Sequence, residues 1–407
     1  MSLNETPSAN RVHIGFFGRR NAGKSSVVNA VTGQEMSVVS DTLGTTTDPV
    51  IKSMELLPLG PVVILDTPGY DDAGALGEQR VRRTRQVLNR ADLAVLVVDA
   101  TVGFGECEHQ LVERFRHQGV PYVIAWNKCD LPTAGPLPDG EGPAVAVSAL
   151  TGAGIQELRE RLANLRPAEN PRRLLADLVK PLDIVVLVIP IDESAPKGRL
   201  ILPQQQALRD LLEAGAIGVT TRETELPDTL QALGRKPAMV VTDSQAFAIA
   251  ARATPQEIPL TSFSILMARY KGFLETAVRG VAALNSLRNG DRVLIAEGCT
   301  HHRQCNDIGT VKIPRWLKAH SGCDLQIETS SGLGFPDDLS PYRVVIHCGG
   351  CMLNEREVAF RMKCALDQDV PFLNYGIAIA YMNGILHRSL SLFPELQALV
   401  PQKQSHP

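Results

Sequence analysis

Residues 18 to 25 read Gly18-Arg-Arg-Asn-Ala-Gly-Lys-Ser25, and this stretch decides the fold of the first part of the chain. It follows an apolar, β-prone run at residues 12–17 and precedes a helix-forming run at residues 26–31, which is the strand, loop and helix order of a P-loop. The glycines let backbone N–H groups surround a β-phosphate, Lys24 reaches the β- and γ-phosphates, and the Ser25 hydroxyl can coordinate Mg²⁺. The phosphates are therefore expected at Gly18, Asn21, Ala22, Gly23, Lys24, Ser25 and Ser26.

A second motif, Asp66-Thr-Pro-Gly69, follows the predicted strand at residues 62–65. The carboxylate of Asp66 can hold Mg²⁺ through water, and the N–H of Gly69 can sense the γ-phosphate. A loop of this kind is expected to move when the phosphate leaves.

Two later motifs indicate which base is bound. Asn127-Lys-Cys-Asp130 follows a predicted strand, and the Asp130 carboxylate can accept hydrogen bonds from guanine N1–H and the 2-amino group, a pattern that adenine does not offer. Ser148-Ala149, after another predicted strand, matches a loop whose backbone donates to guanine O6. We therefore expect GTP, with its base bound by Asn127, Lys128, Asp130, Ser148 and Ala149.

The segment Gly44-Thr-Thr-Thr-Asp48 resembles the first switch of the tRNA-modification and ribosome-assembly GTPases, the TrmE and Era group. This resemblance implies that Thr46 supplies a second hydroxyl to Mg²⁺ and that Asn21 accompanies a K⁺ ion, so we hypothesise potassium-stimulated hydrolysis. Tyr70 stands where many regulatory GTPases have a glutamine that orients the attacking water, and slow intrinsic hydrolysis is expected. The expected catalytic residues are Lys24, Thr46, Asp66 and Gly69.

The chain has 407 residues, of which 44% are apolar and 21% charged, a balance typical of a globular protein with several domains. Its net charge of −3 gives no general attraction to nucleic acid or anionic lipid. The N-terminus lacks a basic start followed by an apolar run, and the longest apolar stretch is too short to span a bilayer. We expect a cytoplasmic protein with no nucleic-acid and no membrane partner.

A polar segment with two prolines, at residues 166–173, separates the nucleotide domain from a second alternation of strands and helices. This alternation indicates a small parallel sheet. No nucleophile–base pair and no phosphate loop occurs in it, so a structural or self-association module is expected. The predicted strands are residues 183–189, 217–220 and 238–241, and the predicted helices are residues 204–213, 227–233 and 244–251.

Six of the eight cysteines lie beyond residue 298, where their spacing is typical of metal ligands. Cys299-Thr-His301 follows a predicted strand, and so does His347-Cys348-Gly-Gly-Cys351. Because the carboxyl ends of parallel strands meet at one edge of a sheet, the two loops are expected to converge. Three thiolates with histidines suit a Cys₃His zinc site or an iron–sulfur cluster, and the spacing leaves both open.

The GTPase motifs and the two cysteine motifs together resemble the maturation GTPases of FeFe hydrogenases, the HydF family, over essentially the whole chain. The resemblance implies a 4Fe-4S cluster on Cys299, Cys348 and Cys351 in a homodimeric scaffold. Such a scaffold accepts a transient diiron precursor from two radical-SAM maturases and delivers it to apo FeFe-hydrogenase. The implied α/β architecture is a P-loop GTPase domain at residues 1–170, a dimerisation domain at residues 171–262 and a cluster-binding domain at residues 263–407.

The fourth position on the cluster is left open by the sequence. His301 and His347 match histidines of the family, while Cys305 and Asp307 also lie close to the first cysteine motif, as does His302. Water or a cyanide of the precursor are further alternatives. A labile fourth ligand suits a carrier, because cargo must be held and then released.

Two other functions remain as alternatives at this stage. One is an RNA- or ribosome-directed GTPase of the TrmE/Era type with a structural zinc site. The other is a metal-sensing switch without cargo. Iron and acid-labile sulfide distinguish the scaffold from the first alternative, and transfer of activity to apo-hydrogenase distinguishes it from the second.

Overall fold

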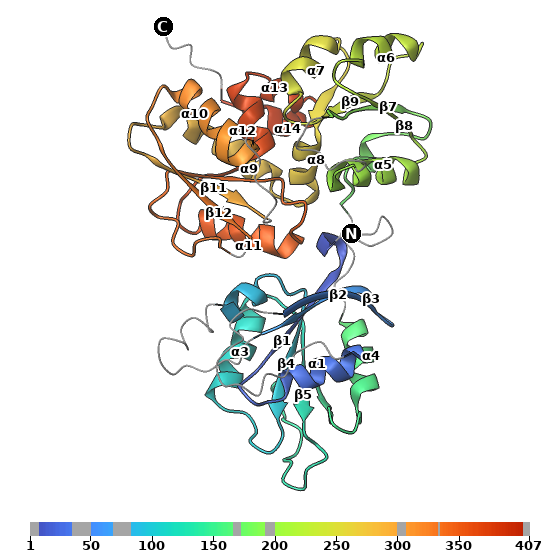
Figure 1. The fold of residues 1–407 in the computed structure, drawn as a ribbon, viewed down its shortest axis with the longest axis vertical. Helices are drawn as coiled ribbons and strands as arrows, with labels where there is room; N and C mark the ends of the chain where they lie inside the picture. Colours follow the sequence, from blue (N-terminus) through green and yellow to red (C-terminus); the bar gives the residue numbers. More distant parts are fainter. Residues whose placement is uncertain are drawn as a thin grey trace. The chain divides into compact units, whose positions relative to one another are not determined.

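The computed structural model describes residues 8–34, 50–67, 83–165, 172–191, 200–298, 307–332 and 334–401. By its internal contacts the chain divides into two compact units, Met1–Asn170 and Pro171–Pro407. Within each unit, strands are flanked by helices in a layered α/β arrangement (Figure 1). Among the described residues, no helix has both the length and the apolar character needed to cross a bilayer.

The first unit is built on a six-stranded sheet in the order β2-β3-β1-β4-β5-β6. All neighbours are parallel except β2, which runs antiparallel to β3 at the edge. The central strands are almost continuous apolar runs, as expected where helices cover both faces of a parallel sheet. The strands are β1 Val12–Phe17, β2 Val50–Leu56, β3 Gly60–Asp66, β4 Leu93–Asp99, β5 Tyr122–Asn127 and β6 Ala144–Ala146.

Helices bury both faces of this sheet in two separate apolar clusters. On one face, α1 (Lys24–Thr32) and α4 (Ile155–Asn164) contribute apolar side chains to a cluster with β1, β3, β4 and β5. On the other, α3 (Glu106–His117) packs against Phe17 through Phe115. The carboxyl ends of the parallel strands, where P-loop proteins bind nucleotides, are thereby fixed on a rigid scaffold.

The second unit contains two parallel four-stranded sheets. The first has the order β10-β9-β7-β8 and the second β12-β11-β13-β14. One continuous apolar core runs through both. The strands are β7 Ile184–Val188, β8 Ile217–Thr221, β9 Met239–Thr242, β10 Leu260–Ser262, β11 Arg292–Glu297, β12 Gln326–Ser331, β13 Val344–His347 and β14 Phe372–Asn374.

Three helices of this unit have a side-chain cap at their N-terminus. Two of these helices follow a strand directly, and the third follows the second cysteine loop. Ser262, Asn354 and Asn374 each accept a hydrogen bond from the backbone N–H three residues later, which satisfies an otherwise unpaired helical donor. The helices are α5 Leu202–Glu213, α6 Leu226–Ala232, α7 Phe247–Ala253, α8 Phe263–Tyr270, α9 Leu274–Gly280, α10 Ile313–Ser321, α11 Glu355–Leu366, α12 Tyr375–Met382, α13 Leu386–Ser389 and α14 Pro394–Gln397. Shorter turns are η1 Ser8–Asn10, η2 Ala176–Leu178, η3 Val281–Ser286 and the π-turn η4 Ile308–Lys312.

The apolar period of residues 273–287 predicts one continuous α-helix, but the structure divides this segment in two. The α-helix α9 ends at Gly280, and the chain continues as the 3₁₀ segment η3. A Cβ added at Gly280 would lie 2.8 Å from the carbonyl oxygen of Phe372, so the helix passes very close to β14 at this point. The apolar periodicity is real, but close packing on β14 changes the hydrogen-bond pattern.

Candidate functional site

The P-loop residues predicted to hold phosphate surround the N-terminus of α1. Lys24 is buried, and its Nζ donates to the carbonyl oxygens of Gly18, at 3.1 Å, and Arg19, at 2.9 Å. The backbone φ angles of Asn21 and Gly23 are 63° and 89°, which turns the loop through the left-handed region. Asparagine and glycine tolerate this conformation better than other residues.

Two of the predicted Mg²⁺ ligands, Ser25 and Asp66, lie side by side. Ser25 Oγ donates to Oδ2 of Asp66 at 2.9 Å. The other carboxylate oxygen of Asp66, Oδ1, is buried and has no hydrogen-bond partner among the described residues. Burial raises the pKa of the Asp66 carboxyl above its usual value. A buried carboxylate oxygen without a partner, next to a hydroxyl, fits a hydrated Mg²⁺.

Asn127 joins the P-loop to the predicted guanine loops. Its Nδ2 donates to the carbonyl oxygen of Ala22 at 3.0 Å, and its Oδ1 accepts from the N–H of Ala149 at 3.1 Å. Ser148 is fully buried, and its Oγ accepts from the N–H of Thr151. Asp130, in contrast, is exposed. The loops are thus held together by Asn127, while the carboxylate predicted to read the base faces solvent.

Two ion pairs, which sequence reasoning missed, brace the same site. Lys128 Nζ contacts Asp99 Oδ2 at 2.5 Å and donates to the carbonyl oxygen of Asn21. Arg19 binds Glu108 of α3 through two nitrogens, and Glu108 is only 1% exposed. In the sequence, the carboxylates of these ion pairs are only an aspartate at the end of β4 and a glutamate in α3. Charged residues at such positions are too common to predict an ion pair.

Several predicted site residues lie outside the described residues. In the nucleotide site these are Thr46 and Gly69. In the metal site they are Cys299, His301, His302 and Cys305. The predictions for these side chains therefore stay predictions.

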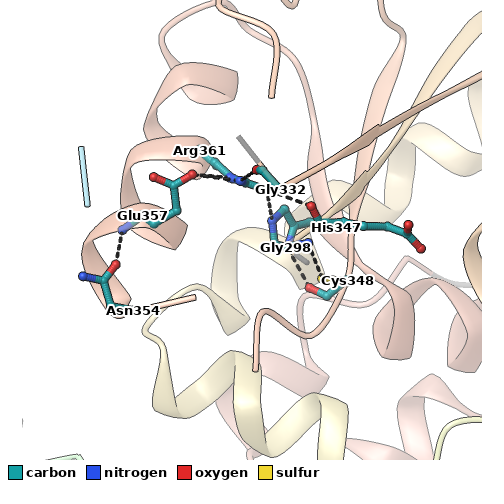
Figure 2. Close-up of polar contacts among 8 residues, drawn as sticks. Gly298, Gly332, His347, Cys348, Asn354, Glu357 and Arg361 are labelled. Carbon is teal, nitrogen blue, oxygen red and sulfur yellow. Dashed lines mark hydrogen bonds and ion pairs between the residues drawn. The ribbon is translucent and has the colours of Figure 1, made fainter. Parts of the chain in front are cut away.

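The two predicted cysteine loops leave adjacent strands. β11 pairs in parallel with β13, so that Ala296 lies opposite His347, and the N–H of Cys348 donates to the carbonyl oxygen of Ala296. Gly298 is the residue that precedes Cys299, and its N–H donates to Sγ of Cys348 at 3.1 Å. The convergence expected from the strand order is therefore present up to residue 298 (Figure 2).

Two backbone N–H groups are directed at the Cys348 thiol. Its Sγ accepts from the N–H groups of Gly298 and Gly350, the second at 3.4 Å. Burial raises the pKa of the Cys348 thiol, while these two N–H groups act in the opposite direction. A bound cation would remove the cost of a buried thiolate, and N–H donors to sulfur are typical of iron–sulfur sites.

His347 lies next to this thiol but is fully buried and faces Arg361. Its Nδ1 lies 2.7 Å from the carbonyl oxygen of Cys348, and its Nε2 lies 3.2 Å from Nη1 of Arg361. Burial and the nearby guanidinium lower the pKa of His347 to about 3, so the ring is neutral at physiological pH. Figure 2 shows the ring between Arg361 and the Cys348 backbone.

Two carboxylates lie at the same end of the sheet. Glu297 is 2% exposed, and its Oε1 accepts from the hydroxyl of Tyr375 at 3.2 Å. Asp307 caps η4, and its Oδ2 accepts from the N–H of Thr310 at 2.9 Å. The sequence pattern suggested Asp307 but did not single out Glu297, because a glutamate at a strand end is ordinarily exposed.

The remaining cysteines differ in their surroundings. Cys351 is partly buried and packs beside the core of the second unit. Cys323 donates from its Sγ to backbone carbonyl oxygens. Burial raises the pKa of the Cys364 thiol to about 11. Within the described part of the chain, no cluster of three or more His, Cys, Asp and Glu side chains is arranged to hold a metal ion.

Comparison with known protein families divides the chain into three matched segments. Residues 13–128 match the 50S ribosome-binding GTPase family, residues 174–272 the hydrogen maturase F dimerization domain, and residues 275–392 the hydrogen maturase F tetramerization domain. The two maturase domains together account for most of the second unit.

Individual relatives resemble the first unit. The tRNA modification GTPase MnmE of Synechococcus sp. (strain JA-2-3B'a(2-13)) is 39% identical over 160 residues, which cover 38% of this chain and 34% of that protein. GTPase Der of Wolinella succinogenes is 33% identical over 178 residues, covering 39% and 36%. The chain thus spans about a third of the length of these relatives.

Solved structures similar to the chain include Aquifex aeolicus Era bound to GDP and aluminium fluoride. It shares 20% identity at a TM-score of 0.34, and the match covers 55% of this chain and 98% of that one. The G domain of T. maritima FeoB shares 23% identity at a TM-score of 0.31, covering 39% and 100%.

The sheet order, the P-loop and the guanine loops define a P-loop GTPase, and this class implies GTP and Mg²⁺ as its ligands. In this chain the GTPase domain is followed by two α/β segments that match oligomerisation domains. The chain belongs to the hydrogen maturase F, or HydF, family.

Proposed function

We propose that the chain is a GTP-hydrolysing scaffold that carries a 4Fe-4S cluster on Cys299, Cys348 and Cys351. The observation that supports this most is the pair of backbone N–H groups directed at Cys348 Sγ, one of them from the residue that precedes Cys299. Cysteine thiolates with N–H donors are the usual setting of such clusters. When bound, the cluster would supply an iron with an exchangeable fourth position at which cargo can attach.

The scaffold would accept a diiron precursor from two radical-SAM maturases and pass it to apo FeFe-hydrogenase. Membership of the HydF family supports this cargo and these partners. The hydrogen bond from the Tyr375 hydroxyl to buried Glu297 gives this end of the sheet a polar wall that is shielded from water. His301, His347, Cys305, Asp307 and Glu297 remain candidates for the fourth position or for its surroundings. A cytoplasmic location is part of the proposal.

In the nucleotide domain, Lys24 would neutralise the β- and γ-phosphates, and Ser25, Thr46 and Asp66 would hold Mg²⁺. The unpartnered Oδ1 of Asp66 supports this role. Asn21, with its left-handed backbone, would place its side chain for K⁺. Asp130, Asn127, Lys128, Ser148 and Ala149 would select guanine, and Gly69 would report the γ-phosphate.

We propose a three-domain organisation with boundaries at residues 170 and 262, in which the chain dimerises through the middle segment. In the described residues, β8 is one of the two edge strands of its sheet, and its neighbour α5 presents Leu212, which is 71% exposed. Ile217 of β8 is 40% exposed. An exposed edge strand flanked by apolar side chains can pair with a second copy.

A zinc-containing GTPase directed at RNA is the second candidate. The likeness of part of this chain to tRNA modification GTPases favours it. The maturase matches over the second unit favour the scaffold.

Anaerobic purification of the full chain decides between these functions. We expect brown protein with iron and acid-labile sulfide in equal amounts, and activation of apo-hydrogenase after incubation with the maturases. Cys348→Ser and Cys351→Ser should remove the cluster and the transfer but leave GTP hydrolysis intact. Cys323→Ser, in which the changed thiol contacts only backbone carbonyls in the described contacts, is the matched control. Colourless protein that contains zinc alone would contradict the proposal.

A further inference from the structure

Arg361 on α11 is fully buried, and it is the largest side chain with essentially no exposure in the described residues. A guanidinium stays charged in proteins, so its burial must be compensated by hydrogen bonds. Its Nε donates to Oε1 of Glu357, one turn earlier on α11, at 2.8 Å. The ring of Phe335 covers the group, with Cζ 5.0 Å from the ring centroid.

The remaining nitrogens of Arg361 reach the ends of three neighbouring strands. Nη1 donates to the carbonyl oxygen of Glu297, the last residue of β11, at 3.4 Å. Nη2 donates to the carbonyl oxygen of Gly332, directly after β12, at 2.6 Å. Nη1 also lies 3.2 Å from Nε2 of His347, the last residue of β13. One guanidinium therefore joins the carboxyl ends of β11, β12 and β13 (Figure 2).

This contact fixes the proton on the ring of His347. Because a guanidinium has only donors, Nε2 of His347 must accept with its lone pair. Nδ1 then carries the proton and donates to the carbonyl oxygen of Cys348 at 2.7 Å. A histidine binds a metal through an unprotonated nitrogen, and in this arrangement neither nitrogen of His347 has a lone pair to offer.

The same contacts fix the backbone of Cys348. Its carbonyl oxygen accepts a hydrogen bond from Nδ1 of His347, and its N–H donates to the carbonyl oxygen of Ala296. Its Sγ accepts from the N–H of Gly298. The carbonyl oxygen of Glu297, immediately before Gly298, is held by Arg361. The ends of the two strands that precede the predicted cluster cysteines are thus anchored to one side chain.

We propose that Arg361 is a positioning residue for the cluster loops, and that His347, fixed by Arg361, positions the Cys348 backbone and is not an iron ligand. This inference rests on the proposed function and adds to it a division of roles. His347 holds the Cys348 backbone, and the fourth position of the cluster is left to a group other than His347. A well-packed apolar residue would fill the position of Arg361 without burying a charge, so the hydrogen bonds to three strand ends are the reason for an arginine here.

Pulsed electron paramagnetic resonance of the reduced cluster tests the role of His347. The full chain is prepared anaerobically with ¹⁵N-histidine, as wild type and as His347→Gln, which keeps one donor and one acceptor in the ring's place. We expect the same iron content and the same nitrogen coupling in both proteins. A strong ¹⁵N coupling that is present in the wild type and absent in His347→Gln would show that His347 is a ligand, and would overturn the inference.

Two variants test Arg361 itself. Arg361→Met removes the charge, and we expect iron retention against a chelator to fall by about tenfold or more, as for other residues that orient metal ligands. Arg361→Lys keeps a cation, but a lysine cannot bond to all three strand ends at once. Iron should therefore be retained, while the g values of the reduced cluster shift because the loops around it are positioned differently. Lys363→Met, an exposed cation on the same helix, is the matched control and should behave as wild type.

The outcomes separate the inference from the proposed function. Wild-type iron retention in Arg361→Met, or unchanged g values in Arg361→Lys, shows that Arg361 does not position the cluster while the scaffold function stands. If Arg361→Met does not fold, Arg361→Lys alone decides, since its spectrum reports on a bound cluster. A wild-type chain that binds no iron overturns both proposals.

Discussion

Ser25 Oγ and Asp66 Oδ2 lie 2.9 Å apart, so the hydroxyl and the carboxylate predicted to serve Mg²⁺ are already in contact at the carboxyl end of β3. The second oxygen of Asp66 is buried without a partner in the described residues. A buried, ionised carboxylate with an unpartnered oxygen is unfavourable unless a cation is bound. Burial is also what raises the pKa of Asp66.

Asp66→Asn should reduce GTP hydrolysis by about a hundredfold and weaken its dependence on Mg²⁺, because an amide binds the hydrated ion less well than a carboxylate. Steady-state phosphate release across a Mg²⁺ titration measures this. Asp139→Asn, which changes an exposed carboxylate in the same unit, should leave the curve unchanged. An Asp66→Asn protein with a wild-type Mg²⁺ dependence would refute the assignment.

Lys24→Ala should lower GTP turnover by about a hundredfold or more, because the buried ammonium group that neutralises the β- and γ-phosphates is removed. Iron content should stay at the wild-type value, since Lys24 and the cysteine loops belong to different compact units. Turnover and iron are measured on the same preparation, which is then tested for activation of apo-hydrogenase. Loss of iron in this variant would show that the two sites do not assemble independently.

Asn21→Gly should remove potassium stimulation. Glycine preserves the left-handed backbone at φ 63° but deletes the amide that we expect at K⁺. We expect wild-type hydrolysis to be about tenfold faster in K⁺ than in Na⁺, since a cation at this place substitutes for an arginine finger. Equal rates in the two salts for the wild type would contradict the potassium hypothesis.

Gly298→Ala should weaken cluster binding. The new Cβ would lie 2.7 Å from Cγ of the buried Leu353, so the loop must shift and carry its N–H away from Cys348. Overpacking of this kind costs about 1–3 kcal/mol of stability. Gly349→Ala is the matched control, because its Cβ would meet only Ser264 Oγ, at 3.9 Å. Iron retention and thermal unfolding are compared, and equal retention in the two variants would argue against the Gly298 contact.

Thr220→Lys should shift the chain toward smaller assemblies. Thr220 is exposed on the edge strand β8, and a lysine there opposes pairing with another strand. Sedimentation velocity at several protein concentrations measures the effect, with GTP turnover as a check on folding. Leu137→Lys, an exposed apolar position in the GTPase domain, is the control. An unchanged assembly in Thr220→Lys would exclude this edge from the dimer interface.

Local pattern was sufficient to predict most of the parallel sheets. Apolar runs that are buried along nearly their whole length, such as β1 and β7, have a strong local signal, and their bounds agree with the predicted residues 12–17 and 183–189 within one residue. β12 was missed because its sequence, Gln326–Ser331, is polar and gains its stability from pairing with β11. β10 and β14 were missed because three residues give too little periodicity.

The sequence by itself determined the P-loop, the guanine loops and the pairing of two cysteine motifs with strand ends, because each depends on neighbours in the chain. Only the tertiary structure showed which groups surround His347. Its residue type and its place beside Cys348 fit a metal ligand, but Arg361 lies fourteen residues later and reaches its Nε2 only through the packing of α11 on the sheet. The burial of His347 and its contact with Arg361 depend on how α11 packs on the sheet, which no local pattern encodes.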